Sequence, residues 1–188
     1  MTIEARLKDL GIDLPKPAAA VANYVPFVRA GNLVHISGQL SNDADGGIKG
    51  TVGDDVDLET AVAGARLCGI NLVAQIKAAC DDDLERVVRI VKLGGFVQAA
   101  GDFIEIPKVI NGCSDLMVDM FGDAGRHARS AVGVYRLPLA SPSRWTPSSR
   151  CGEHRRRLHP QGPRPHPSDR TRRLGRLRGA HWRPVRGL

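Results

Sequence analysis

The composition of this chain changes abruptly near residue 139, and the change limits what each part can fold into. Residues 1–139 carry 14 Lys and Arg side chains against 18 Asp and Glu, whereas residues 140–188 carry 13 Arg, no Lys and 2 acidic side chains. The second part also holds 7 of the 12 prolines and shows no regular apolar period. Such a segment cannot bury enough apolar surface to offset its chain entropy. The sequence therefore predicts a folded domain at 1–139 and a disordered, Arg/Pro-rich basic tail at 140–188.

The genetic code offers a reason for this change. When residues 140–153 are written in GC-rich codons and read from the third base of each codon, the other frame can give Gly-Val-Ala-Val-Glu-Val-Asp-Ala-Val-Phe-Glu-Val-Arg and then a stop. Alternation with period two is typical of a half-buried strand. The hypothesis is a frameshift near Leu139, so that the 1–139 domain lacks its last strand. The competing interpretation is that residues 140–188 are a genuine tail with a function of its own.

A basic tail is also typical of nucleic-acid binding. Arms that bind nucleic acid usually mix Lys with Arg, and the tail has only Trp145 and Trp182 for stacking on bases. This composition argues against specific recognition, and any binding is expected to be nonspecific and sensitive to salt.

Before residue 139 the apolar residues follow strand and helix periods in turn. Asp57 is suited to cap one helix, and Pro107 fits the first turn of another. The order β-β-α-β-α-β predicts an α+β fold, with two helices on one face of a mixed sheet. The expected elements are strands at 24–29, 33–40, 86–98 and 128–137, and helices at 58–79 and from about 106.

Several classes of protein are not indicated. The four cysteines have no C-x-x-C spacing, so neither a metal site nor a disulfide framework is expected. The first residues are charged and lack the apolar core of a secretory signal. The longest uncharged run, at 30–42, is too short to span a membrane. We expect a cytoplasmic protein without cofactor, metal or membrane contact.

Four polar residues are candidates for a site, although each also has a simpler interpretation. Ser37 lies at the end of a strand, where the Ser-Gly pair could simply form a turn. Tyr24 lies at the start of a strand, where its ring could simply be a packing residue. Arg129 precedes a strand of small residues and could form a surface ion pair, or bind a carboxylate in bidentate fashion. Asn111 lies within a helix, a poor position for Asn unless its side chain has a partner. His35 alternates with apolar residues and is expected to be a sheet residue rather than a base.

Considered together, four segments closely resemble the reactive-intermediate deaminase family, called RidA or YjgF (endoribonuclease L-PSP-like). They are NYVPFVRAGNLVHISGQL, VVRIVKLGGFVQAAGDF, VIN before a Met- and Phe-rich helix, and RHARSAVGVYRLP. The resemblance covers residues 1–139 and is closest to a subgroup of short bacterial members. It implies a chorismate-mutase-like fold, a homotrimer with its sites between subunits, and hydrolysis of 2-imino acids to 2-oxo acids and ammonia.

The resemblance also implies roles for individual residues. Arg129 would bind the substrate carboxylate, and Tyr24 and Ser37 would line the site. Asn111 would be a pocket residue, and the backbone at Ala131 would face the imine or the attacking water. Neither a cofactor nor a metal is implied.

Three positions depart from the family pattern. Ala131 stands where the family often has Cys, and Gly133 where many members have Glu. Arg144 stands six residues after Pro138, where the family has its water-orienting glutamate, and the other reading frame supplies Glu in this position. The resemblance therefore implies impaired hydrolysis. The alternative is a trimeric module that binds a small carboxylate metabolite without turning it over.

Overall fold

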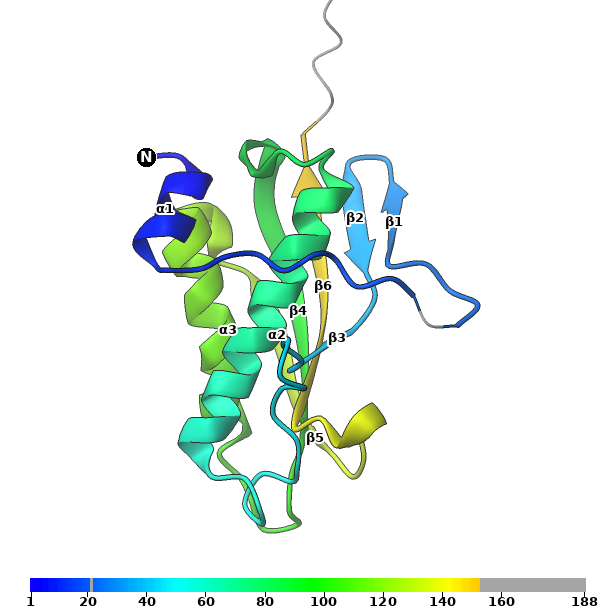
Figure 1. The fold of residues 1–188 in the computed structure, drawn as a ribbon, viewed down its shortest axis with the longest axis vertical. Helices are drawn as coiled ribbons and strands as arrows, with labels where there is room; N and C mark the ends of the chain where they lie inside the picture. The colour runs from blue at the N-terminus through cyan, green and yellow to red at the C-terminus, as the bar shows by residue number, and fades with distance from the viewer. Residues whose placement is uncertain (21, 153–188) are drawn as a thin grey trace, which may run out of the picture. The chain divides into compact units, whose positions relative to one another are not determined.

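The computed structural model describes residues 1–20 and 22–152, and its central element is a mixed, six-stranded sheet (Figure 1). The strand order is β1-β2-β6-β4-β5, and β3 also pairs with β6. β4 and β5 run parallel, and all other pairs are antiparallel. The strands are β1 (Phe27–Ala30), β2 (Leu33–Ile36), β3 (Gln39–Leu40), β4 (Val87–Gln98), β5 (Ala128–Val134) and β6 (Ser143–Cys151), and the helices are α1 (Ile3–Asp9), α2 (Leu58–Ala79) and α3 (Ile106–Phe121).

Both predicted helices are confirmed, and their ends follow from local chemistry. The carboxylate of Asp57 accepts a hydrogen bond from the backbone N–H of Thr60 at 2.7 Å, which satisfies a donor in the first turn of α2. α3 has Pro107 in its first turn, where the missing N–H costs nothing. It ends at Gly122, which adopts a φ of 59°.

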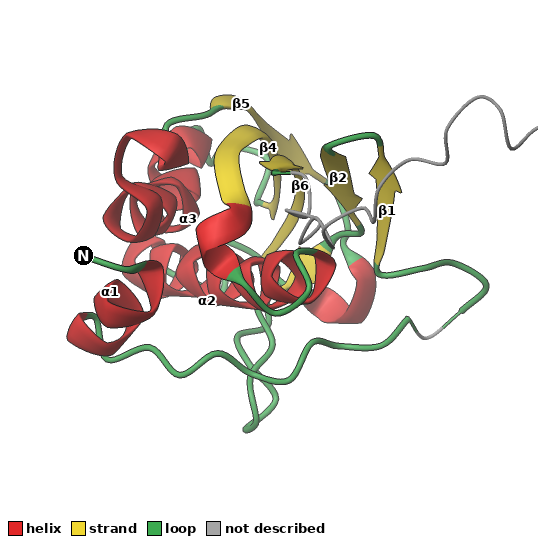
Figure 2. Ribbon diagram, turned by 90° about the horizontal axis from the view of Figure 1, so that it is seen from above, coloured by secondary structure: helices red, strands yellow, loops and turns green. Residues whose placement is uncertain are grey.

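The two long helices cover the same face of the sheet (Figure 2). They also pack closely on each other, because small residues stand at their contact. A Cβ added at Gly112 of α3 would overlap the carbonyl oxygen of Val62 in α2, and one at Gly69 of α2 would press on Leu116 of α3. The predicted α+β architecture, with helices on one face of a mixed sheet, is therefore confirmed.

The N-terminal segment reaches across the helix layer toward the first strand. The chain after α1 crosses α2 (Figure 1), and the side chain of Gln75 in α2 donates to the backbone oxygen of Ala18 at 2.7 Å. Beyond it, β1 and β2 lie within two of the expected strand ranges, 24–29 and 33–40, apart from Ala30 at the end of β1. They form a hairpin, with Ala30 opposite Leu33 and Gly31 at a φ of 63° in the turn.

The expectation that the domain lacks its last strand is wrong for the structure. Residues 143–151 form β6, which lies between β2 and β4 in the middle of the sheet. Backbone hydrogen bonding depends little on side chains, so a segment of poor strand composition can still complete a ladder that would otherwise have unpaired groups. The boundary expected at residue 139 therefore falls before a strand of the same compact unit, Met1–Glu153, and the rest of the expected tail lies outside the described residues.

Candidate functional site

Arg129 and Asn111 lie together, at the start of β5 and on α3. Nη1 of Arg129 donates to Oδ1 of Asn111 at 2.8 Å and to Oγ of Ser114 at 3.3 Å. Asn111 and Ser114 are one helical turn apart, so both face β5. This partner explains an Asn in the middle of a helix. Within residues 1–20 and 22–152, Nε and Nη2 of Arg129 have no hydrogen-bond partner, and the side chain is exposed.

A hydrogen-bonded chain continues from Arg129 to His127. Because the backbone oxygen of Gly125, 2.6 Å from Nδ1 of His127, can only accept, the imidazole proton lies on Nδ1. Nε2 then accepts from the hydroxyl of Ser114 at 3.1 Å, and Ser114 in turn accepts from Arg129. Burial lowers the pKa of His127 from 6.5, and the charge of Arg129 acts in the same direction. Nε2 can accept from Ser114 only when the imidazole is neutral, so the lowered pKa of His127 agrees with this order of donors and acceptors.

The sequence analysis missed Ser114 and His127. Only their spacing from the predicted residues could have indicated them. Ser114 follows Asn111 by three residues, which places both on one face of the helix, and His127 precedes Arg129 by two residues, which is the period of a strand. Neither spacing identifies a network unless the helix is known to pack beside β5.

Ala131 and Gly133 face the same side of β5 as Arg129. Ala131 is half-buried and lies opposite Gly95 in the parallel β4–β5 pair. A Cβ added at Gly133 would meet Ile106 of α3 at 3.4 Å, so this position faces the helix layer. β5 is an edge strand, and the backbone at Ala131 therefore lies at an open sheet edge.

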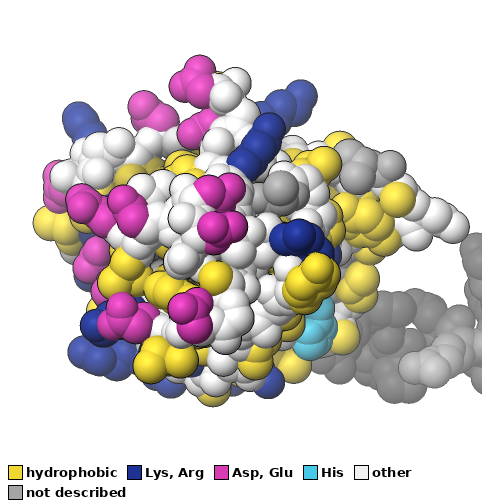
Figure 3. Space-filling model, turned by 90° about the horizontal axis from the view of Figure 1, so that it is seen from below, with side chains coloured by type: hydrophobic (Ala, Val, Ile, Leu, Met, Phe, Trp, Pro, Cys, Tyr) yellow, Lys and Arg dark blue, Asp and Glu magenta, His cyan; other side chains and the backbone are white. Residues whose placement is uncertain are grey.

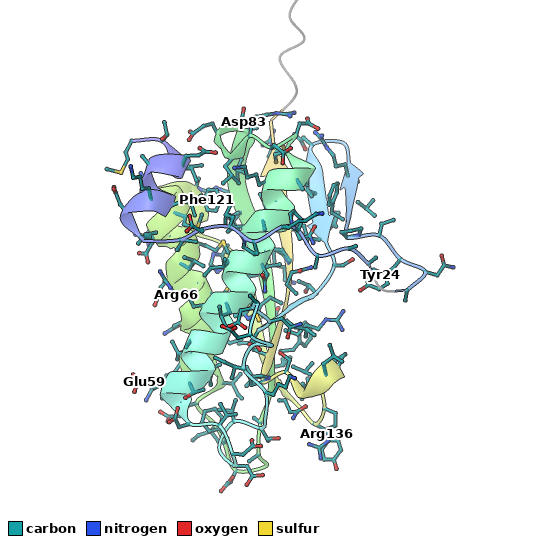
Figure 4. All side chains as sticks on the ribbon, viewed as in Figure 1. Tyr24, Glu59, Arg66, Asp83, Phe121 and Arg136 are labelled. Carbon is teal, nitrogen blue, oxygen red and sulfur yellow. The ribbon has the colours of Figure 1, made fainter. Side chains whose placement is uncertain are left out.

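Tyr24 and Ser37 belong to a second group of residues. Both line a cavity of about 620 Å³. It is formed by residues 13–20, called here the N-terminal arm, by the segment 37–44 and by α2. The hydroxyl of Ser37 donates to the backbone oxygen of Val25 at 2.6 Å, so its oxygen faces a ligand only as an acceptor. Tyr24 is half-exposed, on the loop before β1 (Figure 4).

Arg144, the residue in the expected glutamate position, lies beside this second group. It stands opposite Leu40 of β3 and Phe96 of β4, and a Cβ added at Gly38 would overlap its Nε atom. A guanidinium therefore lies against the backbone that follows Ser37.

The five predicted site residues thus form two groups. Arg129, Asn111 and Ala131 lie along β5 and α3, while Tyr24 and Ser37 line the cavity beside the N-terminal arm. No hydrogen bond joins the groups within the described part of the chain, and the lining of the 620 Å³ cavity does not include Arg129, Asn111 or Ala131.

Other chemistry in the described residues is sparse. No three His, Cys, Asp or Glu side chains converge there to hold a metal, and no helix is long and apolar enough to cross a membrane. All four cysteines are buried, and burial raises the pKa of Cys68 to about 12, which disfavours a thiolate nucleophile. The face shown in Figure 3 carries acidic and basic side chains side by side rather than a continuous basic surface.

The comparisons with known proteins agree with this fold. The family model described as "YjgF/chorismate_mutase-like, putative endoribonuclease" matches residues 4–143. Protein TCP17 of Trypanosoma cruzi is 45% identical over 141 residues, which cover 74% of this chain and 88% of that protein.

Two solved structures are similar as well. The protein Atu1372 from Agrobacterium tumefaciens, described as of unknown function, is 43% identical with a TM-score of 0.75, covering 79% of this chain and 92% of that one. A "putative endoribonuclease" from Shewanella oneidensis MR-1 is 34% identical with a TM-score of 0.77, covering 80% and 99%. The chain therefore belongs to the YjgF/chorismate mutase-like family.

Proposed function

We propose that this chain derives from an enzyme that hydrolyses 2-imino acids to 2-oxo acids and ammonia. The observation that supports this most directly is the guanidinium of Arg129, which Asn111 and Ser114 orient through Nη1 while its Nε and Nη2 edge has no hydrogen-bond partner among the described residues. That edge fits a carboxylate in bidentate fashion.

The reaction requires few groups. A 2-imino acid bound by its carboxylate at Arg129 presents its C=N carbon to a water molecule. The water adds to that carbon, its proton passes to nitrogen, and the C–N bond of the resulting carbinolamine breaks to release ammonia and leave a 2-oxo acid. A positioned general base contributes about 10²–10⁴-fold to such a step, and fixing the substrate contributes through orientation.

We propose further that the site is completed in a homotrimer. The Arg129 group of one subunit would meet the Tyr24 and Ser37 group of its neighbour, which accounts for their separation within one chain. Exposed valines on three strands of the sheet, at Val28 in β1, Val88 and Val91 in β4, and Val132 in β5, offer apolar area for such an assembly.

In this chain the activity would be impaired. Arg144 places a cation where the proposed mechanism needs the general base, and it would repel a protonated imine. The family match ends at residue 143, where β6 begins, in line with a frameshift near Leu139.

The test compares the chain with a variant in which residues 140–188 are replaced by Gly-Val-Ala-Val-Glu-Val-Asp-Ala-Val-Phe-Glu-Val-Arg, called here the restored-strand variant. Ammonia release is measured from a freshly generated 2-imino acid, and subunit number by light scattering. We expect a trimer with turnover for the variant and loss of both for the chain. Equal assembly and equal turnover would contradict the proposal, and sequencing the gene across codons 135–155 tests the frameshift directly.

A second candidate is a binding module without turnover, favoured by the guanidinium of Arg144 against Gly38. Both functions need Arg129, so binding alone does not separate them. Calorimetric binding of a 2-oxo acid by the chain itself, which keeps Arg144, without faster ammonia release would favour the module.

A further inference from the structure

β6 occupies a central position in the sheet. Its register shows which side chains of a strand in this position are buried and which are exposed. It pairs with β4 along nearly its whole length and with β2 and β3 on its other side. Its side chains alternate between the helix layer and the open face. The inward positions, all buried, are 143, 145, 147, 149 and 151.

Three of the residues at these inward positions, Trp145, Pro147 and Ser149, fit poorly. Oγ of Ser149 and Nε1 of Trp145 are buried without a hydrogen-bond partner in the described structure. Each such group carries a desolvation penalty. Pro147, opposite Leu93, has no N–H to donate, although proline is normally confined to edge strands. The β4–β6 register also shifts twice, between Val87 and Arg89 and between Ile90 and Lys92.

The outward side of β6 shows a mismatch of charge. Arg150 stands directly opposite Arg89 of β4. Like charges at facing positions of neighbouring strands are destabilising. The amide oxygen of Asn32, in its favoured orientation, accepts from Nε and Nη2 of Arg150 at 3.0 and 3.1 Å, but a neutral amide does not cancel the charge.

The surroundings of β6 therefore suit a different strand, with apolar residues at the five inward positions and a carboxylate opposite Arg89. With the GC-rich codons described above, the other reading frame can meet each requirement in the same register. It then has Val, Val, Ala, Phe and Val at positions 143, 145, 147, 149 and 151, and Glu at 150.

We propose that the position of β6 is an acceptor site for an extended peptide with alternating apolar and acidic residues, and that such a peptide displaces β6. Main-chain hydrogen bonds supply affinity in this mode of recognition, and alternate side chains supply specificity. The inference rests on the fit of β6 to its neighbours and not on any catalytic activity.

The experiment uses the full chain and the labelled peptide Val-Glu-Val-Asp-Ala-Val-Phe-Glu-Val, which matches positions 143–151. Trp182→Phe leaves Trp145 as the only tryptophan, and Trp145 is fully buried. We expect saturable binding by fluorescence anisotropy, with a shift of the Trp145 emission to longer wavelength. Because β6 is tethered and competes at an effective concentration of roughly millimolar, the titration extends to that range.

Two controls make the result specific. A peptide of the same composition, with its acidic residues moved to inward positions, is expected to bind at least about tenfold more weakly, since it buries charge instead of apolar area. Arg89→Glu is expected to reverse the charge preference, favouring a peptide with Lys in place of the second Glu.

Three results would overturn the proposal. They are no binding at millimolar peptide, equal binding of the two peptides, and binding that leaves the emission of Trp145 unchanged. The last would place the peptide at an open edge of the sheet, β1 or β5, with β6 still in position. None of these results depends on turnover, so the failure of this proposal and the failure of the proposed hydrolysis can be distinguished.

Discussion

Nη1 of Arg129 lies 2.8 Å from Oδ1 of Asn111, so a strand residue and a helix residue 18 positions apart hold one guanidinium in place. Nη1 also donates to Oγ of Ser114, while Nε and Nη2 have no hydrogen-bond partner among the described residues.

Arg129→Lys in the restored-strand variant should lower imine hydrolysis about 100-fold or more. An ammonium group cannot bind a carboxylate in bidentate fashion, and a misplacement of about 1 Å costs on this scale. Steady-state ammonia release measures the effect. Arg66→Lys is the matched control, because Arg66 lies on α2 in a partly exposed pair with Asp119. Turnover by Arg129→Lys equal to that of Arg66→Lys would remove Arg129 from the mechanism.

The stability of the chain should fall as the pH drops below about 6.5, through the protonation of His127. Burial lowers the folded-state pKa of His127, so the unfolded state binds the proton more readily. The stabilising contribution is therefore complete above the unfolded pKa of 6.5 and is lost as the pH falls toward the folded value. Urea unfolding between pH 5 and 8 measures it.

His127→Gln should flatten this pH dependence, because a glutamine side chain does not titrate in this range. A pH profile unchanged by His127→Gln would show that burial and the charge of Arg129 do not hold this histidine neutral.

Ser149→Ala should raise the free energy of unfolding by about 1 kcal/mol. It removes a buried hydroxyl that has no partner among the described residues, and such groups carry an uncompensated desolvation cost. Ser141→Ala should lower it by a similar amount, because Oγ of Ser141 accepts from the backbone N–H of Ser41 and donates to the oxygen of Ser143 at 2.9 Å. Chemical denaturation measures both changes. A change of the same sign in the free energy of unfolding for the two variants would contradict the conclusion that the Ser149 hydroxyl is unsatisfied and the Ser141 hydroxyl is satisfied.

Gly112→Ala should destabilise the chain by about 1–3 kcal/mol, although alanine favours helices. Its Cβ would overlap the carbonyl oxygen of Val62, so the helices would have to move apart. Gly64→Ala, on α2, places its Cβ in ordinary contact at 3.5 Å and should stabilise by about 0.5–1 kcal/mol. Thermal unfolding of the two variants distinguishes packing from helix propensity, and stabilisation by both would show that the α2–α3 contact is loose.

Local chemistry in the sequence predicted much of the fold. Asp57, Pro107 and Gly31 act within one turn of the chain, so the ends of two helices and the first hairpin follow from neighbouring residues alone. The α+β class followed from the order of these elements. The candidate residues came from the resemblance, and their roles stay predictions.

Pairing across the sheet was decided by tertiary structure. The composition of residues 140–188 predicts no strand, yet residues 143–151 lie between β2 and β4, because backbone groups on both neighbours need partners whatever the side chains are. Likewise, nothing local in the sequence relates Ser114 to His127, or Arg150 to Arg89. These contacts join residues that are distant along the chain or lie on different elements, so they exist only once α3 is packed beside β5 and β6 is paired with β4. Local sequence determined the helices and the strands before residue 139, whereas pairing with β2 and β4 determined β6, and packing determined which side chains meet.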